Sequence, residues 1–481
     1  MVQVTFDYDT SRKKGIIVSD YLSNIREHFS VEDKQQVFKR RYAIGYRPQT
    51  RQYAITPQGR FKPRLVFSIL EFLQKQDIQF NIEVTDKFRD VITIPVLKEE
   101  LVKLNLSPRD YQEESVMSAI RNKSGVIVLP TSAGKTLVIA LLVKSIQAQH
   151  DCKTLILVPD IQLVAQTYSD FIEYGISEDE ITKWTGSIEP NKDAKIVISN
   201  AQILLSEKQD LSLLKDIKLL VIDEVHKLKY GNKINKVVEQ IPALFRYGLT
   251  GTLPDNKIDQ WNIFGKIGKV IYFKQSIDLR EQKYISQVHV AALKLTYKNT
   301  PQFTISSMVN PTAGYEEEIT WLQTNQFRNS IITKLVNKAD KNTLIMVDRI
   351  AHGEELLRVL QANTNKEVHF VHGAVEIEER EMIRKLMEEQ DNVACIAISK
   401  IFSTGINIKN LHNIIFAAIG KARIKIIQSI GRSLRKHSSK KLATIFDIWD
   451  NLRYGNKHMV ERLALYDREE IPYSVTELTE P

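Results

Sequence analysis

Apolar and polar positions follow two different patterns along this chain, and the change between them falls near residue 100. In the first part, the alternation in residues 2–6 (VQVTF) predicts a strand, whereas residues 65–74 (LVFSILEFLQ) have the spacing of a helix. The apolar run at residues 91–96 also has the composition of a strand. Residues 1–98 are therefore expected to form a small α+β domain.

After about residue 100, short and fully apolar runs alternate with longer amphipathic segments. Such runs predict strands that are buried on both faces, and the interleaved helices predict a parallel sheet. The expected strands are 125–129, 154–158, 195–199 and 219–222, and then 342–347, 367–371, 393–398, 413–418 and 442–446. We therefore expect two α/β domains, at 99–280 and 281–450, joined by a connecting region around 270–330 and followed by a tail, 451–481, without an assigned role.

Length and composition narrow the class of protein. With 481 residues, 43% hydrophobic and 26% charged, the chain is expected to form about three folded domains rather than to stay disordered. No apolar run approaches the ~20 residues of a membrane-spanning helix, and the acidic start is unlike a secretory signal. Cys152 and Cys395 are too few for a disulfide framework or a zinc site, so buried, reduced thiols are expected. The net charge of +9 favours a polyanionic partner, but weakly.

The segment LPTSAGKT at residues 129–136 has the features of a phosphate-binding loop. It follows an apolar strand and precedes a helical run, so backbone N–H groups and a helix start would meet an anion there. In such a loop Lys135 contacts the β- and γ-phosphates, and the Thr136 hydroxyl is a ligand of Mg²⁺. The general pattern asks for glycine where Leu129 stands, which leaves open that Gly-Lys-Thr merely begins a helix.

A second acidic signal lies about ninety residues further on. Asp223 and Glu224 directly follow the apolar run 219–222. The carboxyl end of a buried parallel strand is where such sheets bind ligands. Asp223 can hold Mg²⁺, and Glu224 can act as the general base toward water. Alone, this pair would be read as a helix N-cap, but together with Gly-Lys-Thr it predicts hydrolysis of a nucleoside triphosphate.

These motifs, in this order, resemble those of superfamily 2 helicases and translocases of the DExH type, over roughly residues 105–450. The resemblance implies a tandem of two RecA-like parallel-sheet domains that binds ATP between its two domains. The further motifs that carry it are RDYQ at 109–112, LVP at 157–159, QLVAQ at 162–166, Thr185-Gly186, SNAQ at 199–202, DEVH at 223–226, LTGTL at 249–253, LIMVD at 344–348, VHG at 371–373, STGIN at 403–407 and QSIGRSLR at 428–435.

The resemblance implies a role for individual residues. Arg432 and Arg435, three apart, would share a helix face toward the γ-phosphate, with Arg435 as the arginine finger, and His226 would link the ATP site to the motif at 249–253. Many relatives carry aspartate where Asn407 stands, which leaves the ribose contact open. The expected ATP-binding residues are Arg109, Gln112, Thr131, Ser132, Ala133, Gly134, Lys135, Thr136, Gly405 and Asn407. The expected strand contacts within the motifs are Gln166, Thr185, Gly186 and Thr404.

The first domain carries a basic segment, 39–64, without an acidic residue and with interleaved aromatics. Basic side chains neutralise phosphates and aromatic rings stack on bases, although a solvated basic face would have the same composition. The candidate contacts are Arg40, Arg41, Arg47, Arg51 and Arg60. A small basic domain before these motifs resembles the phage UvsW-type helicases.

That narrower resemblance implies an ATP- and Mg²⁺-dependent DNA helicase that remodels forks, four-way junctions and RNA–DNA loops in phage recombination, repair and replication. It also implies a monomer in the host cytoplasm, with single-strand-binding or recombination proteins as candidate partners and no membrane association. The residues leave three alternatives open: an RNA helicase, a motor subunit of a larger complex, and a nucleic-acid-binding scaffold. Intact Lys135, Asp223, Glu224 and Arg435 argue against the scaffold, whose ATP site would be inactive.

Overall fold

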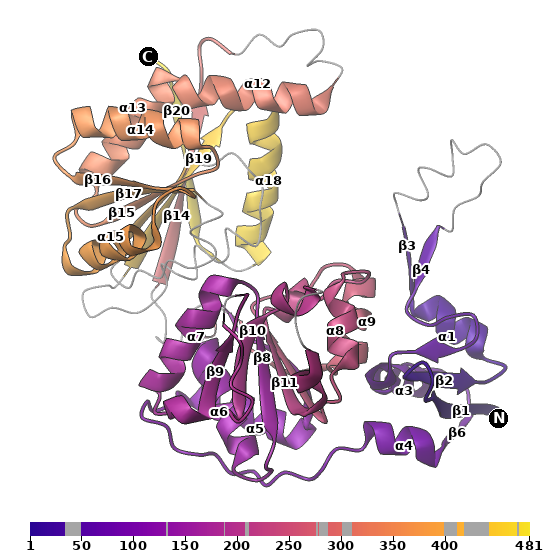
Figure 1. Ribbon diagram of the computed structural model, residues 1–481. Coiled ribbons are helices and arrows are strands. Elements are labelled where there is room, and N and C mark those ends of the chain that lie inside the picture. Colours follow the sequence, from indigo (N-terminus) through magenta and orange to yellow (C-terminus); the bar gives the residue numbers. More distant parts are fainter. Residues whose placement is uncertain are drawn as a thin grey trace. The chain divides into compact units, whose positions relative to one another are not determined.

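A computed structural model describes residues 1–33, 50–130, 133–186, 188–206, 211–275, 278, 287–300, 310–398, 411–417, 442–468 and 471–481. The chain divides into two compact units, the first comprising residues 1–130 and 134–274 and the second residues 131–133 and 275–481 (Figure 1). Unit 1 contains an N-terminal domain and a first α/β domain, and unit 2 contains a second α/β domain. None of the described helices is long and apolar enough to cross a membrane.

The N-terminal domain is a small mixed sheet with helices packed on it, as the sequence predicted for its class. Its elements are β1 (Val2–Asp9), β2 (Lys14–Val18), α1 (Leu22–His28), β3 (Ser30–Glu32), β4 (Arg51–Tyr53), β5 (Arg60–Phe61), η1 (Pro63–Leu65), α3 (Val66–Gln74), β6 (Phe80–Val84) and α4 (Asp86–Ile92). The sheet order is β5-β2-β1-β6, with β1 antiparallel to β2 and parallel to β6. Phe6, Phe61 and Phe88 pack edge-to-face and stacked in its core.

The strand predicted at residues 91–96 is wrong. The helix α4 extends to Ile92, and the residues after it form no strand. Thr85 sets the start of α4, because its side-chain oxygen accepts the Phe88 N–H, and Asp86 lies in the first turn. A short apolar run suits either element, and here no described neighbouring strand pairs with it.

The core of the N-terminal domain is completed by the first α/β domain. Trp261 and Phe264, from helix α9 (Lys257–Lys266), pack against its apolar cluster. The ring centroids of Phe29 and Trp261 are 5.2 Å apart. Gly265 lies so close to Lys62 that an added Cβ would approach the Lys62 Cβ to 2.5 Å. The two domains of unit 1 are therefore joined by an apolar contact as well as by the chain that links them.

The first α/β domain has a parallel sheet in the order β13-β7-β12-β11-β8-β10-β9. Its strands are β7 (Ser124–Val128), β8 (Lys153–Val158), β9 (Ile181–Trp184), β10 (Ile196–Asn200), β11 (Ile217–Asp223), β12 (Phe245–Thr250) and β13 (Val270–Phe273). Its helices are α5 (Asp110–Asn122), α6 (Lys135–Gln147), α7 (Ile161–Glu173), η2 (Glu178–Glu180), η3 (Ile203–Leu205), η4 (Leu211–Lys215), η5 (Val225–Lys227), α8 (Ile234–Gln240) and α9. The strands predicted from the apolar runs are confirmed.

Unit 2 has a second parallel sheet, in the order β16-β17-β15-β18-β19-β14-β20. Its elements are β14 (Gln287–Thr296), α12 (Pro311–Thr324), α13 (Gln326–Lys338), β15 (Thr343–Val347), α14 (Ile350–Asn363), β16 (Glu367–Val371), α15 (Ile377–Glu389), β17 (Val393–Ile398), β18 (Asn413–Phe416), β19 (Leu442–Asp450), α18 (Arg453–Arg468) and β20 (Tyr473–Thr479). Apolar residues of α12, α13 and α14 form one core with the sheet (Figure 1). The predicted fold class, two parallel-sheet domains in tandem after a small α+β domain, is confirmed.

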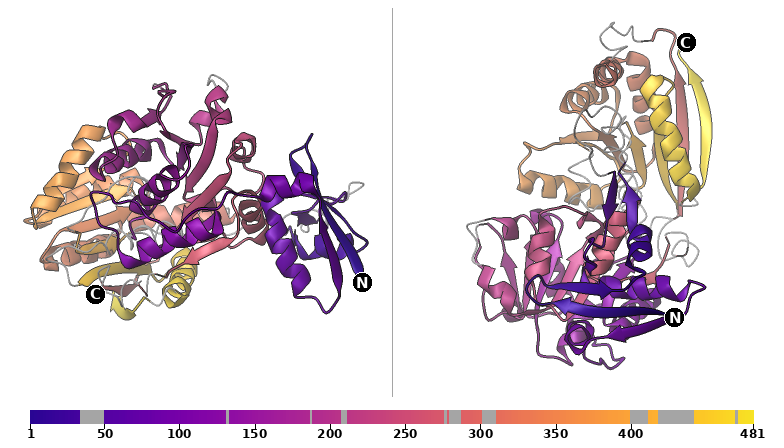
Figure 2. Two further views of the ribbon diagram at one scale, coloured as in Figure 1. Left: turned by 90° about the horizontal axis from the view of Figure 1, so that it is seen from below. Right: turned by 90° about the vertical axis from the view of Figure 1, so that its right-hand side faces the viewer.

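Residues 451–481, to which the sequence assigned no role, are part of unit 2. The strand β20 pairs in parallel with β14, and α18 packs against β19, as Figure 2 shows in yellow. A buried ion pair holds α18, because the Arg462 Nε donates to the Asp447 Oδ2 at 2.9 Å. The Glu318 carboxylate accepts the N–H groups of Tyr454 and Gly455 at the start of α18.

Both cysteines are buried and free, as expected. Burial raises the pKa of the Cys152 thiol to about 11 and that of the Cys395 thiol to about 12. Neither thiol is therefore a nucleophile at neutral pH.

Candidate nucleotide-binding site

The phosphate-binding loop joins β7 to α6, as the sequence predicted. Gly134 is the N-cap of α6 and has a φ of +74°. The backbone conformation favours glycine, and a Cβ at this position, 2.5 Å from the Gln112 Nε2 atom, would have to displace the end of the Gln112 side chain. Ala133 is buried, and Thr136 is partly buried in the first turn of α6. Thr131 and Ser132 lie outside the described residues.

The acidic motif follows β11, two strands away from β7 in the sheet order β7-β12-β11. Because the strands are parallel, the carboxyl ends of all three meet at one edge. The Lys135 Nζ lies 3.7 Å from the Glu224 Oε1, and these side chains are 12% and 16% exposed. The structure thus brings together the lysine and the carboxylate that the sequence placed about ninety residues apart.

The two neighbouring carboxyl groups differ in their electrostatic environment. Burial, together with the charge of Glu224, raises the pKa of Asp223 to about 6. Burial also opposes ionisation of Glu224, but the Lys135 charge and the hydrogen bond from His226 outweigh it and lower the pKa of Glu224 to about 2. At neutral pH Glu224 is therefore fully ionised, as a general base must be, and Asp223, whose pKa also lies below 7, is mostly ionised as well.

The Thr136 hydroxyl and the Asp223 carboxylate are hard oxygen ligands of the kind that Mg²⁺ prefers. They follow β7 and end β11 at the same edge of the sheet, so the donor set fits this ion. The described residues contain no cluster of three or more His, Cys, Asp and Glu side chains that would form a complete protein metal site.

His226 connects the acidic motif to the motif at the end of β12. Its Nδ1 lies 3.1 Å from the Glu224 Oε2 and 2.8 Å from the Thr250 Oγ1. The Thr250 hydroxyl donates to the Thr252 carbonyl at 2.8 Å. Because the ionised Glu224 carboxylate can only accept, the His226 Nδ1 carries a proton, and this one N–H faces both the Glu224 and the Thr250 oxygens. The contact expected between the two motifs is present, and its role in coupling stays a prediction.

Gln112 and Arg109 lie at the start of α5, next to the phosphate-binding loop. The Gln112 Oε1 accepts the Arg109 N–H at 2.8 Å, and its side chain is buried beside Gly134. The Arg109 guanidinium donates to the Tyr111 hydroxyl at 3.1 Å. Gln112 therefore fixes the start of α5 against the loop, and its contact with ATP stays a prediction.

The predicted nucleic-acid contacts fall into three groups. Gln166 lies on α7, and Thr185 and Gly186 follow β9, so they lie toward the end of the sheet away from β7. Arg51 pairs with Glu27 at 3.0 Å and Arg60 with Asp9 at 3.1 Å, so these two arginines each have an acidic partner within the N-terminal domain. Arg40, Arg41, Arg47 and Thr404 lie outside the described residues, and so do four residues that were predicted for the ATP site, Gly405, Asn407, Arg432 and Arg435.

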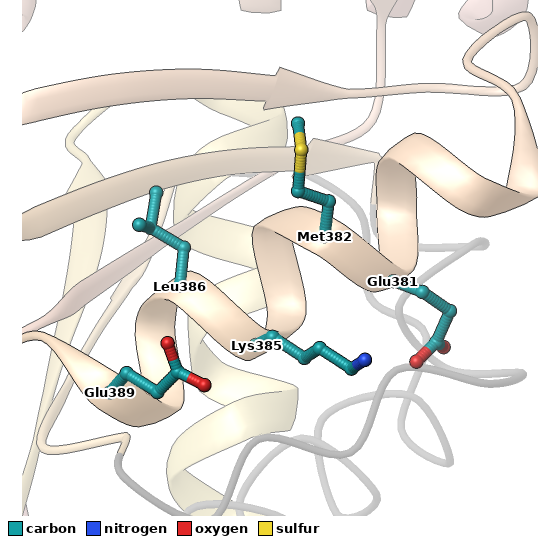
Figure 3. A pocket seen from close by; sticks show the side chains of 5 residues that line it. All are labelled: Glu381, Met382, Lys385, Leu386 and Glu389. Carbon is teal, nitrogen blue, oxygen red and sulfur yellow. The ribbon is translucent and has the colours of Figure 1, made fainter.

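A surface hollow of about 370 Å³ lies on α15 in unit 2. Figure 3 shows the side chains that line it, which are Glu381, Met382, Lys385, Leu386 and Glu389. None of them belongs to a predicted motif. The predicted ATP-site residues that the structure describes therefore lie at the strand ends of the first α/β domain and not in this hollow.

Comparison with known proteins gives the class that this fold and site define. The family "Type III restriction enzyme, res subunit" matches residues 105–255, and "Helicase conserved C-terminal domain" matches residues 328–437. Together the two matches span more than half of the chain, in the order of the two α/β domains. The chain belongs to the superfamily 2 helicases and is an ATP-dependent helicase by class.

Among individual proteins, the chain is 29% identical over 393 residues to the ATP-dependent DNA helicase uvsW of Enterobacteria phage T4, with 76% of each chain covered. It is 25% identical over 351 residues to the DNA 3'-5' helicase XPB of Kineococcus radiotolerans, covering 70% of this chain but only 59% of that relative. The DNA-bound structure of the ATP-dependent Type ISP restriction-modification enzyme LlaBIII shares the fold, with a TM-score of 0.60, 16% identity and coverage of 86% of this chain and 36% of the other. Within superfamily 2 the chain is thus UvsW-like, as its motifs predicted.

Proposed function

We propose that this chain hydrolyses ATP with Mg²⁺ to unwind or branch-migrate branched DNA, including forks and four-way junctions. The observation that supports this most directly is the line of contacts from Lys135 through Glu224 and His226 to Thr250. These contacts join Lys135, which would hold the phosphates, and Glu224, which would act on water, to the motif at 249–253, which precedes α9. A motor needs such contacts, because they lead from the hydrolysis site to another part of the domain.

In the proposed reaction, Lys135 contacts the β- and γ-phosphates, and Thr136 and Asp223 hold the Mg²⁺ ion. The ion neutralises charge on the phosphate oxygens. Glu224 takes a proton from a water molecule as the water oxygen bonds to the γ-phosphorus. The bond from this phosphorus to the bridging oxygen breaks, and ADP and phosphate result. Arg432 and Arg435 would stabilise the charge that develops on the γ-phosphate.

The DNA substrate is proposed from the relatives, several of which are named as DNA helicases or translocases. The residues proposed to contact it are those of the basic segment in the N-terminal domain, together with Gln166, Thr185, Gly186 and Thr404. Work in phage recombination and repair, in the host cytoplasm, would follow from the UvsW-like character. The N-terminal domain, residues 1–98, is proposed as a nucleic-acid-binding domain on the same ground.

The test is ATP hydrolysis by the purified chain, titrated with single-stranded DNA, linear duplex, a fork, a four-way junction and matching RNA. Stronger stimulation by the fork and junction than by linear DNA is expected. Equal stimulation by every polymer, or a preference for RNA, would contradict the branched-DNA substrate. Strand displacement on the fork is the second measurement, because a motor subunit of a larger complex would hydrolyse ATP without separating strands. The Lys135→Ala variant is the control for hydrolysis by a contaminant.

A further inference from the structure

Three lysines lie on the surface of the first α/β domain, outside every motif that the sequence singled out. Lys229, Lys233 and Lys236 follow the acidic motif, and all three are exposed. We refer to them as the lysine ridge. The sequence has no acidic residue from Val225 to Val238. In the part of the chain that the structure describes, none of the three lysines forms an ion pair.

The backbone that carries the lysine ridge is held in place by side chains of α9 and by Asn235 within the ridge segment itself. The Asp259 carboxylate accepts the Tyr230 N–H at 2.7 Å, and the Asn235 side chain donates to the Lys229 carbonyl at 2.8 Å. Asn262 of α9 donates to the Leu228 carbonyl at 2.8 Å. The ridge is therefore a fixed array of positive charge and would lose little backbone entropy on binding a ligand.

The ridge continues toward the N-terminal domain through Glu239. Lys236 and Glu239 are three residues apart on α8, so they lie on one face of it. The Glu239 carboxylate receives Lys14 at 2.8 Å, Lys266 at 3.3 Å, and also Lys62. One carboxylate thus faces three lysine side chains. Burial lowers the pKa of Lys266 to about 7 and that of Lys62 to about 8, so Lys266 is only partly charged at neutral pH and the surplus positive charge beside the ridge comes mainly from Lys14 and Lys62.

The positive charge of the lysine ridge is unfavourable for α8, the helix that carries part of it. Lys233 is the N-cap of α8 and makes no side-chain cap, and Lys236 lies in the first turn. Cations are unfavourable at the N-terminus of a helix, and like charges three residues apart repel each other. The arrangement therefore costs stability in the free protein, and a bound anion would remove that cost.

We propose that the lysine ridge binds the phosphate backbone of a nucleic acid, with Lys14 and Lys62 adding to its field. The inference rests on the proposed function, because it assigns a contact surface to the same motor. Backbone rather than base contacts are favoured, because Tyr230, 48% exposed, is the ridge's one large exposed ring. A solvated basic face that binds nothing is the opposing interpretation.

The test replaces Lys229, Lys233 and Lys236 together by alanine in the full chain and measures DNA affinity at several salt concentrations. Each lost phosphate contact reduces the slope of log K against log salt by about 0.9 for duplex and about 0.7 for single strands. We expect the slope to fall by about 2 to 3, with weaker binding throughout. The change in slope is measured on a blunt duplex and on a single strand of equal length. The polymer whose slope falls by the value given for it is the one that binds the ridge.

Two matched variants control this test. Replacement of Lys334, Lys338 and Lys385, which are exposed lysines of α13 and α15, removes the same charge from unit 2 and should leave the slope unchanged. Arginine at all three ridge positions should keep the slope of the unaltered chain. An alanine variant that melts normally and has an unchanged slope would overturn the inference, while DNA-stimulated hydrolysis by the unaltered chain would still uphold the proposed function. Absence of that stimulation in the unaltered chain would instead contradict the proposed function.

Discussion

Glu224 has a backbone conformation that residues with side chains rarely adopt, with φ at +51° and ψ at +49°. Such a conformation costs on the order of 1–3 kcal/mol and persists only where its surroundings determine it. Here Lys135 and His226 hold the carboxylate, and the Glu224 N–H donates to the Asp223 Oδ1 at 2.9 Å. The strain turns the Glu224 side chain back toward the phosphate-binding loop, where a general base is needed.

Replacing Lys135 by alanine should reduce ATP hydrolysis by at least about 100-fold, the usual loss when one group that stabilises developing charge is removed. DNA binding without nucleotide should change little, since the site lies apart from the basic surfaces. Steady-state hydrolysis and DNA anisotropy on the same preparation measure both. Near-normal turnover in this variant would contradict the assignment of the loop.

Replacing Thr250 by valine removes the hydroxyl that the His226 Nδ1 contacts and leaves the contact with Glu224 in place. The variant also loses the hydrogen bonds between the Thr250 hydroxyl and the Thr252 backbone. The part of the loss that reaches Glu224 is the single contact with His226, about 1 kcal/mol, which should slow hydrolysis only about fivefold. Strand displacement should fall much further if this contact transmits hydrolysis to movement. Thr250→Ser, which keeps the hydroxyl, is the control. Parallel losses of both activities would mean that the contact serves the chemistry alone.

Residue types at the site could be predicted because phosphate and Mg²⁺ chemistry requires them in this order. The Glu224 conformation and the proton on the His226 Nδ1 could not be predicted, because contacts between distant strands set both. The lysines of the ridge were visible in the sequence as a stretch without acidic residues. Their fixed backbone depends on Asp259 and Asn262 of α9, which only the fold brings near.

At the scale of elements, most strands of the two large sheets were predicted from their apolar runs, the edge strand β16 among them, whereas β9, β12, β13, β14 and β20 were not. Strands such as β8, β10 and β17 are mostly apolar and almost wholly buried, which is the pattern of a strand with both faces covered. The edge strand β20 is mostly exposed and polar, so its sequence has no such pattern. Its place beside β14 is set by backbone pairing, together with the Lys294–Glu477 ion pair and the contact between His289 and Ser474.

A buried network joins several elements of unit 2 around Arg328, at the start of α13. Its guanidinium donates to the Asp450 carboxylate at the end of β19, at 2.8 and 3.2 Å, and to the Ala417 carbonyl after β18, at 2.8 Å. It also contacts the His352 Nε2 at 3.2 Å. Burial and the Arg328 charge lower the pKa of His352 well below its usual value, so the neutral ring accepts this bond. The Tyr297 hydroxyl completes the set by donating to Asp450 at 2.6 Å.

Replacing Arg328 by methionine should lower the free energy of unfolding of unit 2 by about 3–5 kcal/mol, because it leaves Asp450 buried without its cation. Urea unfolding, followed by a signal from unit 2, measures this loss. Replacing both Arg328 and Asp450, by methionine and leucine, should cost less than the sum of the two single losses. Additive losses would mean that the two side chains act independently.

At the scale of the whole molecule, the sequence predicted the number and order of the domains but not the contact within unit 1. The packing of Trp261 and Phe264 against the N-terminal domain joins residues more than two hundred positions apart from Phe29. Nothing in the local pattern of α9 distinguishes a helix face that covers its own sheet from one that covers another domain.

Glu239 makes that contact depend on pH. Burial opposes its ionisation, but hydrogen bonds from Lys14 and Lys62 lower its pKa from the usual 4.5 to about 2. A carboxyl group whose pKa is lower in the folded state contributes stability above its unfolded pKa and loses it as the pH falls through the folded value. This contribution should therefore be complete above about pH 5 and should fade between about pH 4.5 and pH 2.

The Glu239→Gln variant should accordingly be less stable than the unaltered chain near neutral pH, and the two should converge as the pH approaches 2. Unfolding by urea over a pH series measures the difference. The exposed Glu113, replaced by glutamine, is the control and should show no such trend. A difference in the free energy of unfolding that is independent of pH would mean that the Glu239 charge contributes nothing to the contact between the two domains of unit 1.

The shared core of unit 1 also sets an order of events during synthesis. The N-terminal domain is complete in sequence by Ile92, but α9, which covers part of its core, extends to Lys266. At about 5–20 residues per second, the ribosome needs roughly 10–35 seconds to make the intervening chain. During that time α9 does not yet cover the aromatic surface around Phe29 and Phe72 of the nascent chain. A slow codon cluster between these two points would lengthen the wait, and we expect the yield of active protein to be more sensitive to pausing there than after α9 has emerged.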